Sequence, residues 1–365
     1  MDNNLIVIVF KLPPPYIGTT VWAETLKDSK LKQLTNVVFF NSNIHKDLST
    51  MGKISVKGIL KNIALYFELL VFLIKKKPAL VVIPISQSGP GFLKDSLFIL
   101  IARFFSNKIL LILHGSNFKN WFDSAFFLMK HYVSWIFKLT CGIIVLGHKI
   151  KPLFHKWYKE EHIYVVPNGL NINTPAKTEP AEATRILYLG NLQPSKGIED
   201  LLMAVENVTV SANNVGLHII GKWGDEKTKQ NAHDLASKSA VNVVFHSPKY
   251  GEDKFRELFA SDIFVFPPRM PEGHPLVIVE AMAAGLPIIS TDQGAITESV
   301  LDGVNGFIVP SHSPKKIAEK INYLLKNPDE RKKMGIESRR LYDQNFTEDK
   351  MVENLAEVFK KVMDG

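Results

Sequence analysis

The stretch DIFVFPPRMPEGHPLVIVEAMAAGLPIIST, residues 262–291, contains the pattern that decides the fold. Each end is a short apolar run of the kind that forms a buried strand, and the segment 275–284 between them has the composition of a helix. A strand, a helix and a second strand in this order predict one unit of a parallel sheet.

The helix in this unit has clear ends and an unusual charge. Pro275 suits a first helical turn, where its missing N–H costs nothing, and Gly285 followed by Pro287 is a typical stop. The residues from Leu276 to Val279 are apolar around the whole circumference, which predicts a buried helix. Glu280 then lies in buried surroundings and requires a hydrogen-bonding partner, either a ligand or a nearby lysine.

The same alternation of strands and helices runs along the chain and predicts an α/β fold with two Rossmann-like domains. Strand-like runs occur at 5–10, 36–40, 79–85, 108–115, 141–147, 163–169, 185–191, 216–224, 242–248, 262–268, 286–292 and 306–310. Helical segments are expected at 58–74, 93–105, 197–207, 251–260, 275–284 and 314–326. The Asn-, Thr- and Pro-rich stretch 168–184 is interpreted as the linker between the domains.

Composition narrows the class of protein. A chain of 365 residues with 46% hydrophobic residues can bury two cores. The single cysteine, Cys141, excludes an internal disulfide and indicates a reducing compartment, so a cytoplasmic location is expected. The first ten residues lack the basic region of a signal peptide, and the apolar run 63–74 is too short to cross a bilayer.

The basic residues are unevenly distributed. Residues 1–180 hold 22 basic and 10 acidic side chains, a net +12, whereas 181–365 hold 22 and 26, a net −4. Lysines at 75–77 and 149–159 and the aromatic-rich stretch 117–137 favour an anionic membrane surface as partner. The same residues are about equally consistent with a basic face that contacts only water. No motif for nucleic acid accompanies the charge, so none is expected as a partner.

Chemically suited residues follow the predicted strands. Lys196 lies in GNLQPSKG (190–197) just before a helix, where an ammonium group and backbone N–H groups together can hold a phosphate. Glu272 precedes the helix at 275, beside free N–H groups. Gly18 and His114 follow two strands of the first half; these two signals are weaker, because such residues are often structural.

In this order the motifs resemble those of retaining nucleotide-sugar glycosyltransferases with the GT-B fold, family 4. The resemblance covers essentially the whole chain and rests on EGHPLVIVEAMAAGLPII, GNLQPSKG, VPNGLN, LHGS and DGVNGFIV. It implies an acceptor-side domain over 1–170, a nucleotide-sugar-binding domain over 171–345, and a last helix, 346–365, that packs back on the first domain.

The resemblance also implies roles for individual residues. Glu280 should bind the donor's ribose, Glu272 the transferred sugar, and Lys196 the diphosphate, with His114 near the sugar and Gly18 close to the β-phosphate. Catalytic roles are expected for His114, Lys196 and Glu272. The full set of expected donor-binding residues is Gly18, Gly190, Asn191, Lys196, Ser247, Pro248, Glu272, Gly273, His274, Pro275, Leu276 and Glu280.

One position departs from the family. Asn191 stands where many members have an arginine, so the diphosphate loses a bidentate cation. Arg269 or a basic residue of the first domain is the expected substitute, or turnover is slower. The chain also has no Asp-x-Asp pair, and we expect metal-independent chemistry without a cofactor.

The resemblance implies transfer of a hexose-type sugar, with retention, from a UDP- or GDP-linked donor to a glycan. The basic, aromatic first half favours a lipid-linked acceptor in bacterial surface polysaccharide synthesis (O-antigen, capsule or exopolysaccharide). An undecaprenyl-diphosphate carrier at the inner face of the cytoplasmic membrane fits this expectation. The alternatives are an epimerase, a glycan phosphorylase and a non-catalytic scaffold.

Overall fold

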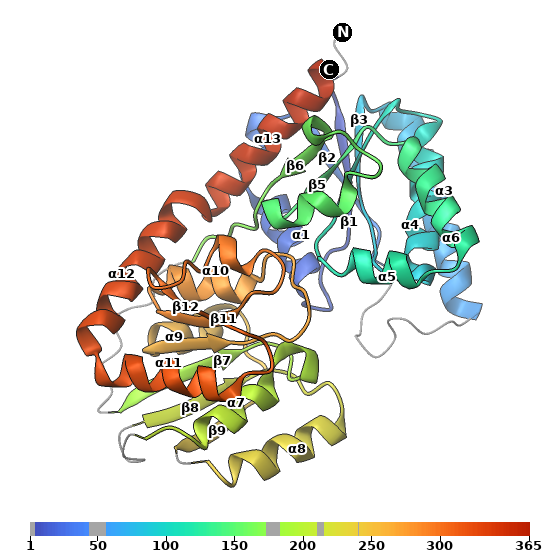
Figure 1. Ribbon diagram of the computed structural model, residues 1–365. Helices are drawn as coiled ribbons and strands as arrows, with labels where there is room; N and C mark the ends of the chain where they lie inside the picture. Colours follow the sequence, from blue (N-terminus) through green and yellow to red (C-terminus); the bar gives the residue numbers. More distant parts are fainter. Residues whose placement is uncertain (1–3, 44–55, 173–182, 210–214, 240) are drawn as a thin grey trace. The chain divides into compact units, whose positions relative to one another are not determined.

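The computed structural model describes residues 4–43, 56–172, 183–209, 215–239 and 241–365, which form two compact units (Figure 1). The first unit comprises Met1–Leu170 together with Glu348–Gly365, and the second comprises Asn171–Thr347. Most of the expected linker 168–184 lies outside the described residues.

The N-terminal unit is built on a parallel sheet in the order β2-β1-β3-β4-β5-β6. Its strands are β1 (Ile6–Phe10), β2 (Val37–Asn41), β3 (Leu80–Pro84), β4 (Lys108–Ile112), β5 (Gly142–Val145) and β6 (Ile163–Val165). Its helices are α1 (Gly18–Asp28), α2 (Leu31–Leu34), α3 (Val56–Lys76), α4 (Gly89–Arg103), α5 (Phe118–Ser124) and α6 (Phe127–Lys138). The strands β1, β3, β4 and β5 are almost wholly buried, as expected of a parallel sheet covered on both faces.

The last helix, α13 (Glu348–Asp364), belongs to this N-terminal unit. Its buried stripe, which includes Val352, Leu355 and Phe359, packs into the core formed by β1 and by Trp22 and Leu26 of α1. Lys30 of the loop before α2 adds ion pairs of 3.0 Å to Asp349 and Glu353. The helix that the resemblance places on the first domain therefore completes that domain's hydrophobic core.

The C-terminal unit contains the second parallel sheet, in the order β12-β11-β10-β7-β8-β9. Its strands are β7 (Thr184–Leu189), β8 (Val215–Ile220), β9 (Asn242–His246), β10 (Ile263–Phe266), β11 (Ile288–Thr291) and β12 (Gly306–Val309). Its helices are α7 (Ile198–Val205), α8 (Glu226–Ala236), α9 (Gly251–Phe259), α10 (Leu276–Ala283), α11 (Pro314–Lys326) and α12 (Pro328–Asn345).

The stretch 262–291 forms the predicted strand–helix–strand unit. β10 and β11 pair in parallel, with Phe264 opposite Ile288, and α10 crosses between them. Six of the eight α10 residues are buried, and the helix ends before Gly285, whose φ of 70° is accessible to glycine at little cost. The α/β fold with two parallel sheets is thus confirmed.

No helix among the described residues is long and apolar enough to cross a membrane.

Candidate active site

The strand order of the C-terminal sheet places Lys196 and Glu272 at the same point. β7 has β8 on one side and β10 on the other, so consecutive crossovers leave in opposite directions at the β7–β10 boundary. Ligands of open α/β sheets bind beyond the carboxyl ends of the strands at such a reversal. Lys196 follows β7 and Glu272 follows β10.

The two side chains meet in an ion pair, between the Lys196 ammonium group and Oε1 of Glu272. Both remain partly accessible, with 27% of the lysine side chain and 16% of the glutamate side chain exposed. An anion and a hydroxyl-bearing group can therefore reach this pair from solvent.

The loop that carries Lys196 is held rigidly against the end of β10. Gly197 has a φ of 76°, and a Cβ atom there would lie 1.8 Å from the carbonyl oxygen of Pro267. The backbone N–H of Arg269 donates to the carbonyl of Ser195 at 2.9 Å. The Tyr188 hydroxyl donates to the carbonyls of Asn191 and Lys196, each at 3.3 Å. Tyr188 and Pro267 were not identified from the sequence as supports of the site.

Glu280 is buried and paired, as its position in an apolar helix requires. Only 3% of the residue is exposed, and its Oε1 accepts a 2.6 Å hydrogen bond from the ammonium group of Lys254 on α9. Its Oε2 is also buried and has no hydrogen-bond partner within the described structure. A lysine thus neutralises the carboxylate, which was one of the two expected partners. Binding of a ligand hydroxyl to the remaining oxygen stays a prediction.

The turn before α10 is held by hydrogen bonds to the segment 295–299. The His274 ring is buried and its Nε2 lies 2.6 Å from Oγ of Ser299; burial lowers the pKa of His274 to about 4. The carbonyls of Glu272 and Gly273 accept from the N–H of Ala295, which anchors this turn. The N–H groups of Ile278 and Val279 donate to the carbonyl of Pro275, whereas Leu276, at the first position of α10, has no intrahelical acceptor for its N–H. The expected roles of Gly273, His274 and Leu276 as backbone donors to a ligand stay predictions.

Arg269 does not provide a free cation in place of the arginine missing at position 191. Its guanidinium group forms a bidentate pair with Asp200, at 2.8 and 2.7 Å, and a further 2.8 Å contact with Glu199. These acids hold the pKa of Arg269 above its usual range. Its role in the described structure is to tie the first turn of α7 to the loop after β10, while Asn191 is exposed.

Three more of the expected donor-binding residues, Gly190, Ser247 and Pro248, also follow strands of this sheet. Gly190 directly follows β7, and a Cβ atom at Gly221, after β8, would lie 1.8 Å from its carbonyl oxygen. Ser247 is exposed and Pro248 is half-buried at the carboxyl end of β9, the edge strand. β9 is two strands away from β7, which precedes Lys196. Ser247 and Pro248 therefore lie two strands from Lys196, at the same carboxyl end of the sheet.

Gly18 and His114 belong to the N-terminal unit. Gly18 is exposed at the start of α1, and a Cβ atom there would meet nothing within 4 Å, so its packing does not require glycine. The His114 ring lies edge-on to Trp22, with centroids 4.5 Å apart. Burial, and secondarily the charge of Lys11, lower the pKa of His114 to about 4, so its imidazole is neutral near pH 7.

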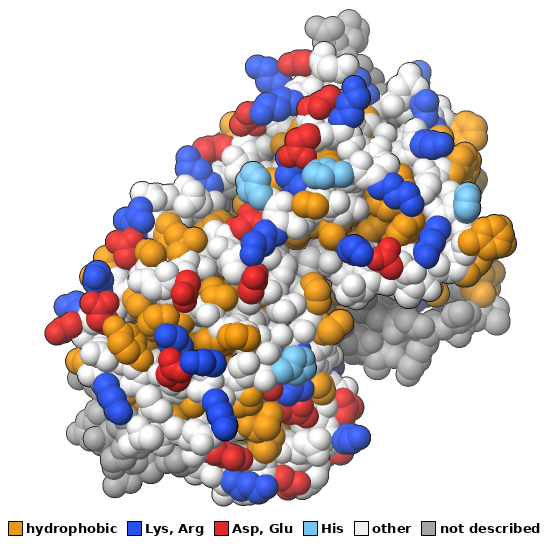
Figure 2. All heavy atoms as spheres, in the orientation of Figure 1, with side chains coloured by type: hydrophobic (Ala, Val, Ile, Leu, Met, Phe, Trp, Pro, Cys, Tyr) orange, Lys and Arg blue, Asp and Glu red, His pale blue; other side chains and the backbone are white. Residues whose placement is uncertain are grey.

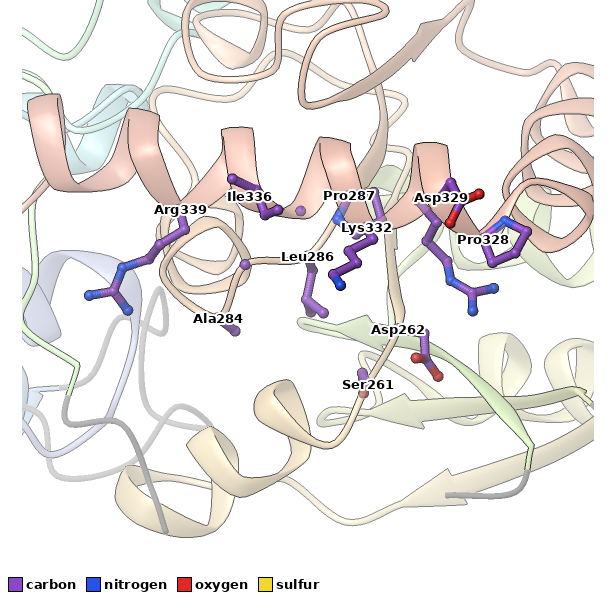
Figure 3. A pocket seen from close by; sticks show the side chains of 13 residues that line it. Ser261, Asp262, Ala284, Leu286, Pro287, Pro328, Asp329, Lys332, Ile336 and Arg339 are labelled. Atoms are coloured by element: carbon purple, nitrogen blue, oxygen red, sulfur yellow. The ribbon is translucent and has the colours of Figure 1, made fainter. Parts of the chain in front are cut away.

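A separate cavity of about 550 Å³ lies at the opposite end of the C-terminal sheet (Figure 3). It is formed by Ser261 and Asp262 before β10, by the segment from α10 to β11, and by α12, which contributes Lys332 and Ile336. Because these residues flank the amino ends of the strands, the cavity is distinct from the Lys196–Glu272 site. No three His, Cys, Asp or Glu side chains of the described ranges are grouped as metal ligands.

The sequence is similar to those of known glycosyltransferases. Residues 172–341 match the family model of glycosyl transferases group 1. Spore coat protein SA of Bacillus subtilis is 35% identical over 182 residues, which cover 48% of each chain. The lipopolysaccharide 1,2-N-acetylglucosaminetransferase of Salmonella typhimurium is 25% identical over 240 residues, 61% of this chain and 62% of that protein.

The fold is shared over nearly the whole chain. Anabaena HepE, solved in complex with UDP-glucose, superposes with a TM-score of 0.75 and 17% identity over 98% of this chain and 99% of its own. The curated relatives above, in contrast, are matched over only about half to three fifths of their length. Retention and membership of family 4 stay predictions, whereas the GT-B fold is confirmed and residues 172–341 match the group 1 glycosyltransferases.

Proposed function

We propose that the chain transfers a hexose-type sugar, with retention of configuration, from a UDP- or GDP-linked donor to a glycan acceptor. The observation that carries the proposal is the Lys196–Glu272 pair at the strand reversal, close to a buried carboxylate with one unpartnered oxygen. A nucleotide sugar has the matching groups: ribose hydroxyls for Glu280, sugar hydroxyls for Glu272 and a diphosphate for Lys196.

In the proposed step the bond between the anomeric carbon and the diphosphate oxygen breaks as the acceptor oxygen bonds to the same carbon. The acceptor's proton passes to the departing phosphate on the same face of the sugar. Lys196 and the N–H groups at the start of α10 stabilise the charge that develops on the leaving phosphate. In this proposal Glu272 positions the sugar and is not the base, and neither a metal ion nor a cofactor is required.

Asn191 bears on how the leaving group is stabilised. With Arg269 committed to Asp200 and Glu199, Lys196 is the cation that the C-terminal unit offers at the β7–β10 boundary. We therefore expect turnover to depend more strongly on this lysine than it would with an arginine at position 191.

The context we propose is bacterial surface polysaccharide assembly, with an acceptor linked to a lipid such as undecaprenyl diphosphate. The protein would then act in the cytoplasm, at the inner face of the cytoplasmic membrane. Support comes from the basic first half of the chain and from the lipopolysaccharide transferase of Salmonella typhimurium among its relatives.

Thermal unfolding with a panel of UDP- and GDP-linked sugars tests the proposal. A donor that binds the native state raises the midpoint, by an amount set by its concentration relative to Kd. The stabilising donor is then incubated with glycan acceptors and the product is identified by mass. Donor turnover without an acceptor would favour an epimerase, and donor binding that Lys196→Ala leaves unchanged would contradict the assigned site.

A further inference from the structure

Three helices of the N-terminal unit, α3, α4 and α6, expose apolar side chains that the fold does not cover. The exposed fractions are 65% for Phe67 on α3, 85% for Phe104 at the end of α4, and 67% for Phe127 on α6. Further exposed apolar residues of these helices and their immediate ends are Ile59, Leu60, Ile63, Ile74, Leu93, Leu97, Phe126, Leu128 and Trp135.

The pattern on α3 shows that this exposure is systematic. Leu65, Leu69 and Leu73, four residues apart, are buried against the unit. Ile63, Phe67 and Ile74 fall on a second stripe of the same helix and are more than half exposed. A helix that is apolar on two faces usually has both faces covered. The described part of the chain covers only one of them.

The three helices form one continuous surface, because α4 contacts both α3 and α6. Figure 1 shows them side by side along one edge of the N-terminal unit, and Figure 2 shows hydrophobic side chains gathered at that edge with lysine and arginine among them. A contiguous exposed patch of this kind marks an interaction surface.

The charge of these helices identifies the partner. The sequences of α3, α4 and α6 contain eight lysine or arginine residues and two acidic ones, Glu68 and Asp95. Asp95 is buried and paired with Lys94 at 3.2 Å, so Glu68 is the exposed acid. Exposed cations stand at the carboxyl ends of the three helices, at Lys75 and Lys76 of α3, Arg103 of α4 and Lys138 of α6. Apolar side chains bordered by cations match a bilayer with anionic headgroups.

We propose that the face made by α3, α4 and α6 is a membrane-docking surface, with its phenylalanines entering the acyl boundary of an anionic leaflet. The inference deepens the proposed function by assigning the membrane contact to specific residues. It narrows the expectation based on residues 117–137, because Phe127 lies on this surface whereas Phe118, Phe122 and Phe137 are buried. It also does not involve segment 149–159, where Lys151 is paired with Glu160.

Vesicle flotation tests this surface. The full chain should float at low salt with phosphatidylglycerol-containing vesicles and much less with pure phosphatidylcholine. Combined Phe67→Ser, Phe104→Ser and Phe127→Ser should reduce the partition coefficient at least about tenfold, since each ring loses apolar burial. Lys75→Glu with Lys76→Glu should reduce it about fivefold per lysine at low salt.

The matched control changes three exposed apolar residues elsewhere, Leu34→Ser, Val304→Ser and Ile336→Ser, whose exposed fractions are 48%, 41% and 60%. This variant should float like the wild type. Failure of the wild type to float, or equal loss in the control, overturns the inference. The inference is also overturned if the wild type binds no vesicles and instead forms a concentration-dependent dimer that the phenylalanine substitutions dissociate. Donor-induced thermal shifts should be the same in all variants, which separates failure of this inference from failure of the proposed function.

Discussion

The ammonium group of Lys196 and the carboxylate of Glu272, 76 positions apart in the chain, neutralise each other at the carboxyl ends of β7 and β10. Because both side chains are partly exposed, little free energy is needed to hold the two charges in this place. A diphosphate that approaches Lys196 must compete with Glu272 for the ammonium group, or share it. In the proposed function, binding of the phosphate to Lys196 is therefore coupled to release of the Glu272 carboxylate toward the sugar.

Replacing Lys196 should slow sugar transfer strongly. Lys196→Ala removes the cation at the leaving phosphate, and loss of one such preorganised group costs about 10²–10³ in kcat. Lys196→Arg keeps the charge and should retain more activity. The measurement is kcat with the donor selected by thermal shift, and Lys238→Ala, an exposed lysine on the same unit, is the control. Equal kcat in Lys196→Ala and wild type would remove Lys196 from the mechanism.

Breaking the Glu280–Lys254 pair should destabilise the C-terminal unit. Lys254→Met leaves a carboxylate that is 3% exposed without its counterion, at a cost of about 3 kcal/mol. Adding Glu280→Gln removes the charge and should restore much of the stability in urea unfolding. The double variant should bind the donor more weakly than the wild type, because the group proposed to accept from the ribose hydroxyls is altered. Additive effects of the two changes would show that the pair is not coupled.

Gly197→Ala should lower stability more than Gly303→Ala. Both positions have nearly the same left-handed φ, 76° and 74°. A side chain at either position therefore adds about 1 kcal/mol or more of backbone strain. A Cβ atom meets nothing within 4 Å at Gly303, whereas at Gly197 it collides with the Pro267 carbonyl. The difference in unfolding free energy between the two variants measures the clash alone. Similar values would mean that the loop moves freely.

Stability should fall as the pH drops from about 6.5 to about 4, in part because of His274. Burial lowers the pKa of His274 to about 4 from its usual value of 6.5, so in this window the unfolded chain binds a proton that the folded chain does not. His274→Gln should flatten the slope of unfolding free energy against pH, whatever constant offset it adds. Urea unfolding at several pH values gives both slopes. Parallel curves would indicate that the histidine is protonated in the folded protein.

The sequence predicted the framework well because it depends on local periodicity. All twelve apolar runs became strands, and the helix after Pro275 ends before Gly285 as expected. The sequence also predicted that Lys196 and Glu272 each follow the carboxyl end of a strand, but it did not predict the ion pair between them.

Side-chain partners were not predictable in the same way. Nothing near Lys254 in the sequence marks it as the counterion of Glu280, because 26 positions and a change of element separate them. Arg269 looked like a free cation until the structure placed Asp200 and Glu199 against it. The aromatic segment after residue 117 was equally ambiguous, since only packing decides which rings face outward.

The position of α13 in the N-terminal core affects the order in which the protein is made. Val352, Leu355 and Phe359 are synthesised after the whole C-terminal unit, yet they fill the layer beneath β1. During translation, part of the hydrophobic surface of the first sheet therefore stays exposed until the second domain and then α13 have been synthesised. Chaperone demand during translation should therefore fall on the domain that appears first.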